Sequence, residues 1–227
     1  MRITIAHRFD FRDGRDSIGR DLIQPRAWDA ARDLPGPFGL PESRAEWERL
    51  ARQPELERRA ADVVAVIRRL GARSLCSHGV GTGSLEFNVN RLAPDVTLTC
   101  TDYAPRATER LQRLFVEAQV IAHDLAVDEP PRADLHLMHR IDTELDTSSW
   151  KLVFARFFEP ILVVPTLLLD LGRMLKELAL RVVRPRATRA GWFRTEDAFR
   201  ALWTDSHSDE VVTVGGQRSF LLLPLGR

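Results

Sequence analysis

The stretch Ser77-His78-Gly79-Val80-Gly81-Thr82-Gly83-Ser84 decides the fold of this chain of 227 residues. It directly follows a short run typical of a strand, and the spacing of Leu85, Val89 and Leu92 after it predicts a helix. Glycine has no Cβ, so the alternating glycines let the backbone turn tightly and let a ligand touch the main chain. The first turn of the helix would then point free N–H groups at that ligand.

A second predicted strand, Val96–Thr101, follows this helix and ends at Asp102. A carboxylate at the tip of the neighbouring parallel strand can accept both hydroxyl protons of a ribose. Strand, glycine turn, helix, strand and acid follow one another at close spacing. This order predicts a binding site for a ligand that contains a nucleoside.

Residues 54–227 alternate between strand-like and helix-like patterns. Strands are predicted at 73–77, 96–101, 120–122, 134–138 and 161–164, with helices between them. Uninterrupted apolar strands that alternate with helices indicate a parallel sheet covered on both faces. The runs 210–214 and 219–223 flank Gly215-Gly216 and predict a hairpin, so the last strand runs against the others. We therefore predict an α/β fold: a doubly wound, mostly parallel seven-stranded sheet with a C-terminal antiparallel hairpin and helices on both faces.

Residues 1–53 show no clear alternation of strand and helix. Charges of both signs are interspersed, the prolines of 35–41 require a loop, and a short helix is expected from Glu42. We predict an N-terminal cap or lid of residues 1–53 and a domain of residues 54–227. The sequence leaves open whether the extension covers a substrate pocket or only packs on the domain.

The overall charge is nearly balanced, with 33 basic and 32 acidic residues and a formal net charge of +1. Such a chain has no global field that would attract nucleic acid. The N-terminus lacks the apolar run of a signal peptide, and the most apolar segment, 161–169, is too short to span a bilayer. We expect a soluble cytoplasmic protein that does not contact membranes. Cys76 and Cys100 lack metal-ligand spacing, so we interpret them as small buried apolar residues and expect no metal.

The glycine stretch, Asp102, the pair Asp124-Leu125 and the reversed last strand resemble the class I (Rossmann-like) S-adenosylmethionine-dependent methyltransferases. The resemblance covers the chain from about Leu56 to the C-terminus, and it implies S-adenosylmethionine as the cofactor. It also implies a role for each matching residue. Gly79, Gly81 and Gly83 would lie against the methionine and ribose, Asp102 would bind the ribose hydroxyls, Tyr103 would lie along the adenine, and Asp124 and Leu125 would bind the adenine edge.

Ser77 departs from the pattern of that family, which usually has an acid two residues before the first glycine. A serine can still hydrogen-bond the ligand's amino group, but it supplies no counter-charge. A non-catalytic, methyltransferase-like partner subunit therefore stays open as an alternative. A nicotinamide dinucleotide fits less well, because Ser84 stands where the third glycine of that motif would be.

Catalytic candidates follow the strand predicted at 134–138, where His139, Arg140, Asp142 and Glu144 stand. We name His139 as the candidate general base because histidine titrates near neutral pH, and a structural histidine at a strand end is the alternative. Arg181–Arg194 is dense in arginine and holds Trp192 and Phe193. It is interpreted as the solvated end of the helix beginning near Leu171, with an RNA-binding segment as the alternative.

The sequence as a whole predicts a methyltransferase that transfers a methyl group in line to a small-molecule acceptor. An RNA-modifying methyltransferase is the competing enzyme, although the charge balance does not support nucleic acid as a partner. A homodimer is compatible with the sequence, which leaves the oligomeric state open.

Overall fold

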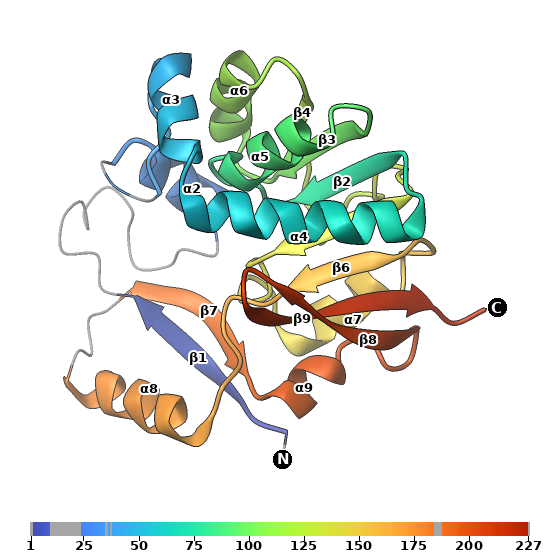
Figure 1. Cartoon of the computed structure of the whole chain (residues 1–227). Coiled ribbons are helices and arrows are strands. Elements are labelled where there is room, and N and C mark those ends of the chain that lie inside the picture. The colour runs from blue at the N-terminus through green and yellow to red at the C-terminus, as the bar shows by residue number, and fades with distance from the viewer. Residues whose placement is uncertain (1, 10–23, 35, 37, 184–187, 227) are drawn as a thin grey trace.

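A seven-stranded sheet in the order β4-β3-β2-β5-β6-β9-β8 forms the centre of the molecule (Figure 1). The computed structural model describes residues 2–9, 24–34, 36, 38–183 and 188–226. Strands β2 to β6 pair in parallel, whereas β9 pairs antiparallel with both β6 and β8. The predicted parallel sheet with a reversed last strand is thus confirmed. The strands are β2 (Ser74–His78), β3 (Thr97–Asp102), β4 (Gln119–Ala122), β5 (Leu135–His139), β6 (Ile161–Val164), β8 (His207–Val214) and β9 (Gln217–Pro224).

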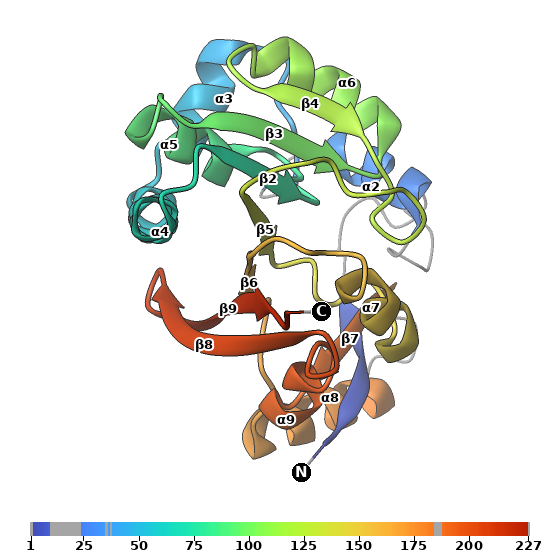
Figure 2. The ribbon, with the colours of Figure 1, turned by 90° about the vertical axis from the view of Figure 1, so that its right-hand side faces the viewer.

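Helices cover both faces of this sheet, because alternate strand residues point to opposite sides. Leu137 and Leu162 lie in the apolar core with α4 (Pro54–Leu70), α5 (Ser84–Leu92) and α6 (Pro105–Leu114). Met138 and Val163 lie in a second core with α7 (Thr147–Phe154) and α9 (Glu196–Arg200). Figure 2 shows α4 and α7 on opposite sides of the sheet.

Two helices before α4, α2 (Pro25–Arg32) and α3 (Arg44–Ala51), pack on helices of the central sheet: α2 contacts α6, and α3 contacts α5. The side chain of Ser43 caps α3 by accepting the N–H of Glu46. Trp47 is 1% exposed, belongs to the main core, and donates from Nε1 to the carbonyl of Thr82 at 2.7 Å. This contact ties α3 to the glycine loop. The division of the chain at residue 53 stays a prediction.

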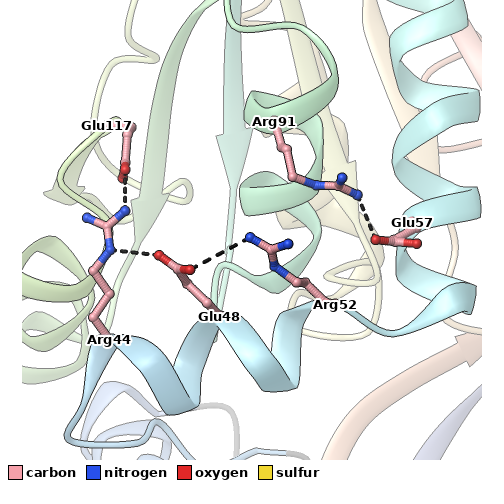
Figure 3. A network of polar contacts seen from close by, with 6 residues as sticks. All are labelled: Arg44, Glu48, Arg52, Glu57, Arg91 and Glu117. Carbon is pink, nitrogen blue, oxygen red and sulfur yellow. Dashed lines mark hydrogen bonds and ion pairs between the residues drawn. The ribbon is translucent and has the colours of Figure 1, made fainter.

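Ion pairs run along α3 and connect it to Glu117 (Figure 3). Arg44 pairs with Glu48 at 2.8 Å and with Glu117, and Arg52 reaches Glu48 at 3.8 Å. Exposed pairs of this kind stabilise a fold by about 0–1 kcal/mol each. The buried Trp47 therefore contributes more than these pairs to the position of α3.

A separate two-stranded sheet joins two segments that are far apart in the sequence. In it, β1 (Thr4–Phe9) pairs antiparallel with β7 (Thr188–Arg194), and α8 (Leu171–Val183) ends before β7 begins. The expectation of a solvated helix end up to Arg194 was therefore wrong, and residues 1–53, which show no clear pattern in the sequence, contribute a strand. Each strand is stabilised by a partner that is distant in the sequence, which local patterns do not reveal. The Trp192 N–H donates to the Thr143 carbonyl at 2.9 Å, so β7 also docks on the loop after β5.

Among the described residues, no helix combines the length and apolar character needed to cross a membrane.

Candidate functional site

A cavity of about 780 Å³ opens at the carboxyl ends of the parallel strands. Ligands of open α/β sheets bind at this edge. The loops after β2, β3, β4, β5 and β6 supply most of the lining, and aromatic side chains from other segments complete it. Those aromatic side chains are Trp28, Phe38, Trp150 and Phe193.

The glycine loop between β2 and α5 forms one wall. Gly79, Gly81 and Gly83 have φ angles of 64°, 60° and 68°, in the left-handed region that side chains with a Cβ disfavour. A Cβ at Gly79 would collide with Ile141, and one at Gly81 would come within 2.8 Å of Arg32 Nη2. Only glycine therefore lets the main chain at these positions face the cavity so closely.

Asp102 links the glycine loop to the start of α6. Its Oδ2 accepts the N–H of Gly81 at 2.9 Å and its Oδ1 accepts the N–H of Ala104 at 3.0 Å. A carboxylate has about four acceptor positions, so two remain for a ligand. Asp102 lines the cavity although it is only 5% exposed.

The structure brings most of the sequence-predicted site residues to this one cavity. The residues that line it are Gly79, Gly81, Asp102, Tyr103, Asp124, Leu125 and His139. Ser77 and Gly83 do not line the cavity. Ser77 is fully buried, and Gly83 is the N-cap of α5. The ligand contacts predicted for these residues stay proposals.

The hydroxyl of Ser77 donates to Glu86 Oε1 at 2.7 Å. Glu86 lies in the first turn of α5 and is 2% exposed. Burial raises the pKa of Glu86 to about 7. Helix α5 thus places a carboxyl group next to the position where the family motif has its acid. Glu86 does not stand out in the sequence, because the motif is defined along the strand and not along the helix.

His139 lies between two arginines. Its Nε2 is 3.2 Å from Arg59 Nη1, which can only donate, so Nε2 is the acceptor. Burial, followed by the charges of Arg59 and Arg140, lowers the pKa of His139 to about 3. The imidazole is therefore neutral at physiological pH.

The pKa of Glu144 is shifted in the opposite direction. It lines the cavity, and its Oε2 accepts from Trp28 Nε1 and from the Tyr103 hydroxyl, each at 3.3 Å. Burial raises the pKa of Glu144 to about 8. The sequence placed Glu144 after the fourth predicted strand without assigning it a role.

Arg32 of α2 is the cavity residue that sequence reasoning missed entirely. It is 7% exposed, donates from Nη1 to the Phe38 carbonyl at 2.9 Å, and lies 5.2 Å from the ring centroid of Trp28. Burial lowers the pKa of Arg32, while Asp102 and Glu144 oppose this shift. No local pattern reveals Arg32, because it reaches the glycine loop only through the fold.

Arg194, the last arginine of the arginine-rich segment, binds main-chain carbonyls in the interior of the protein. Arg194 is 1% exposed and donates to the carbonyls of Asp142 at 2.6 Å and Leu145 at 2.7 Å. Phe193 is buried and lines the cavity. The side chains of the other arginines of this segment lie outside the described part of the chain.

No family model matches the sequence, and no curated protein is similar to it. Solved structures do match. Human N-acetylserotonin methyltransferase in complex with SAM is 18% identical, with a TM-score of 0.60 over 82% of this chain and 57% of the other. The mitomycin 7-O-methyltransferase MmcR is 18% identical, with a TM-score of 0.56 over 89% of this chain and 72% of the other.

DesVI of Streptomyces venezuelae is 11% identical and has a TM-score of 0.57 over 80% of this chain and 97% of the other. The first matched structures are longer proteins, of which this chain spans 57% to 60%. At sequence identities of 11% to 18%, these matches show a shared fold alone. The chain has the fold of the class I S-adenosylmethionine-dependent methyltransferases.

Proposed function

We propose that this protein is an S-adenosylmethionine-dependent methyltransferase that acts on a small-molecule acceptor. One observation carries the proposal: the left-handed Gly79 and Gly81 and the Asp102 carboxylate converge on one cavity at the carboxyl edge of a methyltransferase-type sheet. The cavity volume of about 780 Å³ lies in the upper part of the range of about 300–1,000 Å³ that is usual for small-molecule sites.

The donor half of the site is formed by the loops after β2, β3 and β4. The main chain at Gly79 and Gly81 would face the methionine and ribose, and the free acceptor positions of Asp102 would take the ribose hydroxyls. Tyr103, Asp124 and Leu125 would enclose the adenine. Gly83 would act indirectly, by starting α5, and Ser77 through its bond to Glu86.

The acceptor half is enclosed by aromatic side chains: Trp28, Phe38, Trp150 and Phe193 all line the cavity. Such walls suit a small organic molecule. The names of N-acetylserotonin methyltransferase and mitomycin 7-O-methyltransferase describe enzymes that act on small molecules, which supports the same class of acceptor here.

S-adenosylmethionine supplies an electrophilic methyl group on a sulfonium, which is a good leaving group. The chain must align the acceptor, exclude water and remove a proton where the acceptor carries one. Glu144 is the better proton acceptor, because a base is most effective when its pKa lies near the working pH. His139, the base predicted from the sequence, stays the alternative, and its pKa of about 3 makes it a weak base.

Calorimetric titration with S-adenosylhomocysteine tests the proposal. We expect one molecule bound per chain and an affinity about 10- to 100-fold weaker for Asp102→Asn, because a hydrogen bond to a charged group is worth about 1.5–3 kcal/mol. Asp134→Asn is the matched control. Asp134 accepts two main-chain N–H groups, of Arg73 at 2.7 Å and Ser74 at 3.0 Å, at the opposite edge of the sheet.

The control variant should bind S-adenosylhomocysteine as the wild type does. No heat from the wild type would contradict the proposal and favour the non-catalytic partner subunit. The RNA-modifying alternative predicts binding of RNA that weakens steeply with salt. No RNA binding at low salt, with normal binding of S-adenosylhomocysteine, would exclude that alternative.

A further inference from the structure

Three side chains with metal-ligating atoms meet in the interior, on one face of the central sheet. Cys76 and His78 lie on β2 and His136 lies on β5, where it is the direct register partner of Cys76. All three are at most 1% exposed, and one ligand atom of each lies within 4.8 Å of the others. This group is not visible in the sequence, because its members come from two strands that are neighbours only in the folded sheet.

The two imidazoles face each other, and each has a polar side chain on its far side. His78 Nε2 lies 3.0 Å from His136 Nδ1. On the far sides, His78 Nδ1 lies 3.1 Å from the Thr101 hydroxyl and His136 Nε2 lies 3.8 Å from Glu159 Oε2. Metal-binding histidines commonly have such an outer partner, which fixes the orientation of the ring.

The lone pairs of these imidazoles are available at neutral pH. Burial and the neighbouring His136 and His123 lower the pKa of His78, and burial lowers that of His136 to about 4. The Nε2 of His136 and the Nδ1 of His123 are buried and have no hydrogen-bond partner among the residues that the structure describes. His123 lies beside the group, with its ring centroid 5.9 Å from that of His78. Thr101 and His123 also line the large cavity, so the group lies next to it.

We propose that Cys76, His78 and His136 form a binding site for a zinc-like divalent metal ion, with His123 beside the fourth coordination position. Mixed sulfur and nitrogen ligands suit Zn²⁺. With bond lengths of about 2.0–2.3 Å, the ligand atoms must move together by about 1 Å. The hydrogen bond between the two imidazoles breaks, and the metal takes Nε2 of His78 and Nδ1 of His136.

Proton balance follows from this geometry. Without metal, one of the two facing nitrogens carries the proton of the hydrogen bond between the rings. When the metal binds, that ring moves its proton to its outer nitrogen, so both imidazoles stay neutral with their protons toward Thr101 and Glu159. The buried Cys76 thiol is protonated without metal and releases one proton to the solvent when it becomes a ligand.

Cobalt titration of chelator-treated full-length protein tests the site. We expect one Co²⁺ per chain, a thiolate-to-cobalt charge-transfer band in the near ultraviolet, and loss of this band when Zn²⁺ is added. Cys76→Ser should remove the band and weaken binding by more than about 100-fold, because losing a ligand costs more than the roughly 10- to 100-fold that follows the loss of an outer partner. Zn²⁺ should raise the melting temperature of the wild type but not of this variant.

Cys100→Ser is the matched control. Cys100 is also a buried free cysteine, but its register partner is Ser77, so it lies on the other face of the sheet. The control should keep the band. If Cys76→Ser does not fold, His136→Gln replaces it and should lose tight cobalt binding.

Three results would overturn the site: no stoichiometric binding by the wild type, unchanged binding after Cys76→Ser or His136→Gln, or an equal loss after Cys100→Ser. None of the three proposed ligands lines the cavity, so this experiment and the titration with S-adenosylhomocysteine fail independently.

Discussion

Two titratable side chains of the cavity, Glu144 and His139, have pKa values shifted in opposite directions. Burial raises the pKa of Glu144 to about 8 and, together with Arg59 and Arg140, lowers that of His139 to about 3. In both cases desolvation disfavours the charged form. The consequence differs: Glu144 can exchange a proton near neutral pH, whereas His139 stays a neutral hydrogen-bonding group.

Glu144→Gln should lower the rate of methyl transfer by about 10²- to 10⁴-fold, the usual contribution of a general base, while the affinity for S-adenosylhomocysteine stays nearly the same. The wild-type rate should rise with pH through about 8, because the carboxylate is the active form. The variant should lose this rise. A labelled methyl donor and an acceptor found by screening would supply the measurement. Loss of transfer in His139→Gln, with an unchanged pH profile in Glu144→Gln, would instead make His139 the base.

Glu86 should make stability depend on pH. Its pKa is about 7 in the folded protein and about 4.5 as the reference, so the folded state binds more protons between these pH values. Stability contributed by this group is therefore present at low pH and is lost as the pH rises through about 7. Glu86→Gln removes that loss, on the order of 3 kcal/mol, and keeps an acceptor for Ser77. Urea unfolding of both proteins at pH 5 and pH 8 measures the difference, and equal pH dependence would contradict the assignment.

At the scale of elements, the turn of the β8–β9 hairpin depends on two glycines. Gly215 and Gly216 have φ angles of 59° and 75°, and a Cβ at Gly215 would collide with Arg59, whereas one at Gly216 meets nothing within 4 Å. Gly216→Ala should lower the free energy of unfolding by about 1–2 kcal/mol, because alanine disfavours the left-handed backbone conformation. Gly215→Ala should lower it further, because its Cβ would also collide with Arg59. Gly172→Ala, in α8, is the control and should be neutral or stabilising, since alanine favours helices.

These costs are measured by urea unfolding. Equal stability of Gly215→Ala and Gly172→Ala would contradict this description of the turn.

The docking of α3 should depend on one buried side chain more than on its ion pairs. Trp47→Phe removes the donor to the Thr82 carbonyl and should cost about 1–3 kcal/mol. Because Thr82 belongs to the glycine loop, this variant should also bind S-adenosylhomocysteine more weakly. Arg44→Ala should cost less than about 1 kcal/mol and leave binding unchanged. Unfolding and titration of both variants measure these effects, and a larger effect of Arg44→Ala would contradict them.

For the whole molecule, the sequence predicts the central sheet well. Strands such as Ile161–Val164 are continuous apolar runs, and Gly215-Gly216 marks the turn that reverses β9. These signals are local. The glycine stretch and Asp102 are local as well, because a strand, a turn and the next strand follow one another along the chain.

The remaining features depend on segments that meet only in the folded protein. Strands β1 and β7 pair with each other although they are far apart in the sequence, and Arg32 reaches Gly81 from α2. Cys76 and His136 come together because β2 and β5 are neighbours in a sheet whose strand order differs from sequence order. No short window of sequence carries such information.

The central claim is that the cavity of the whole molecule holds the methyl donor. A crystal structure with S-adenosylhomocysteine at saturating concentration tests it most directly. The claim predicts the ligand in the cavity, with its ribose hydroxyls within hydrogen-bonding distance of Asp102. A cavity without ligand, or a ligand bound elsewhere, would contradict it.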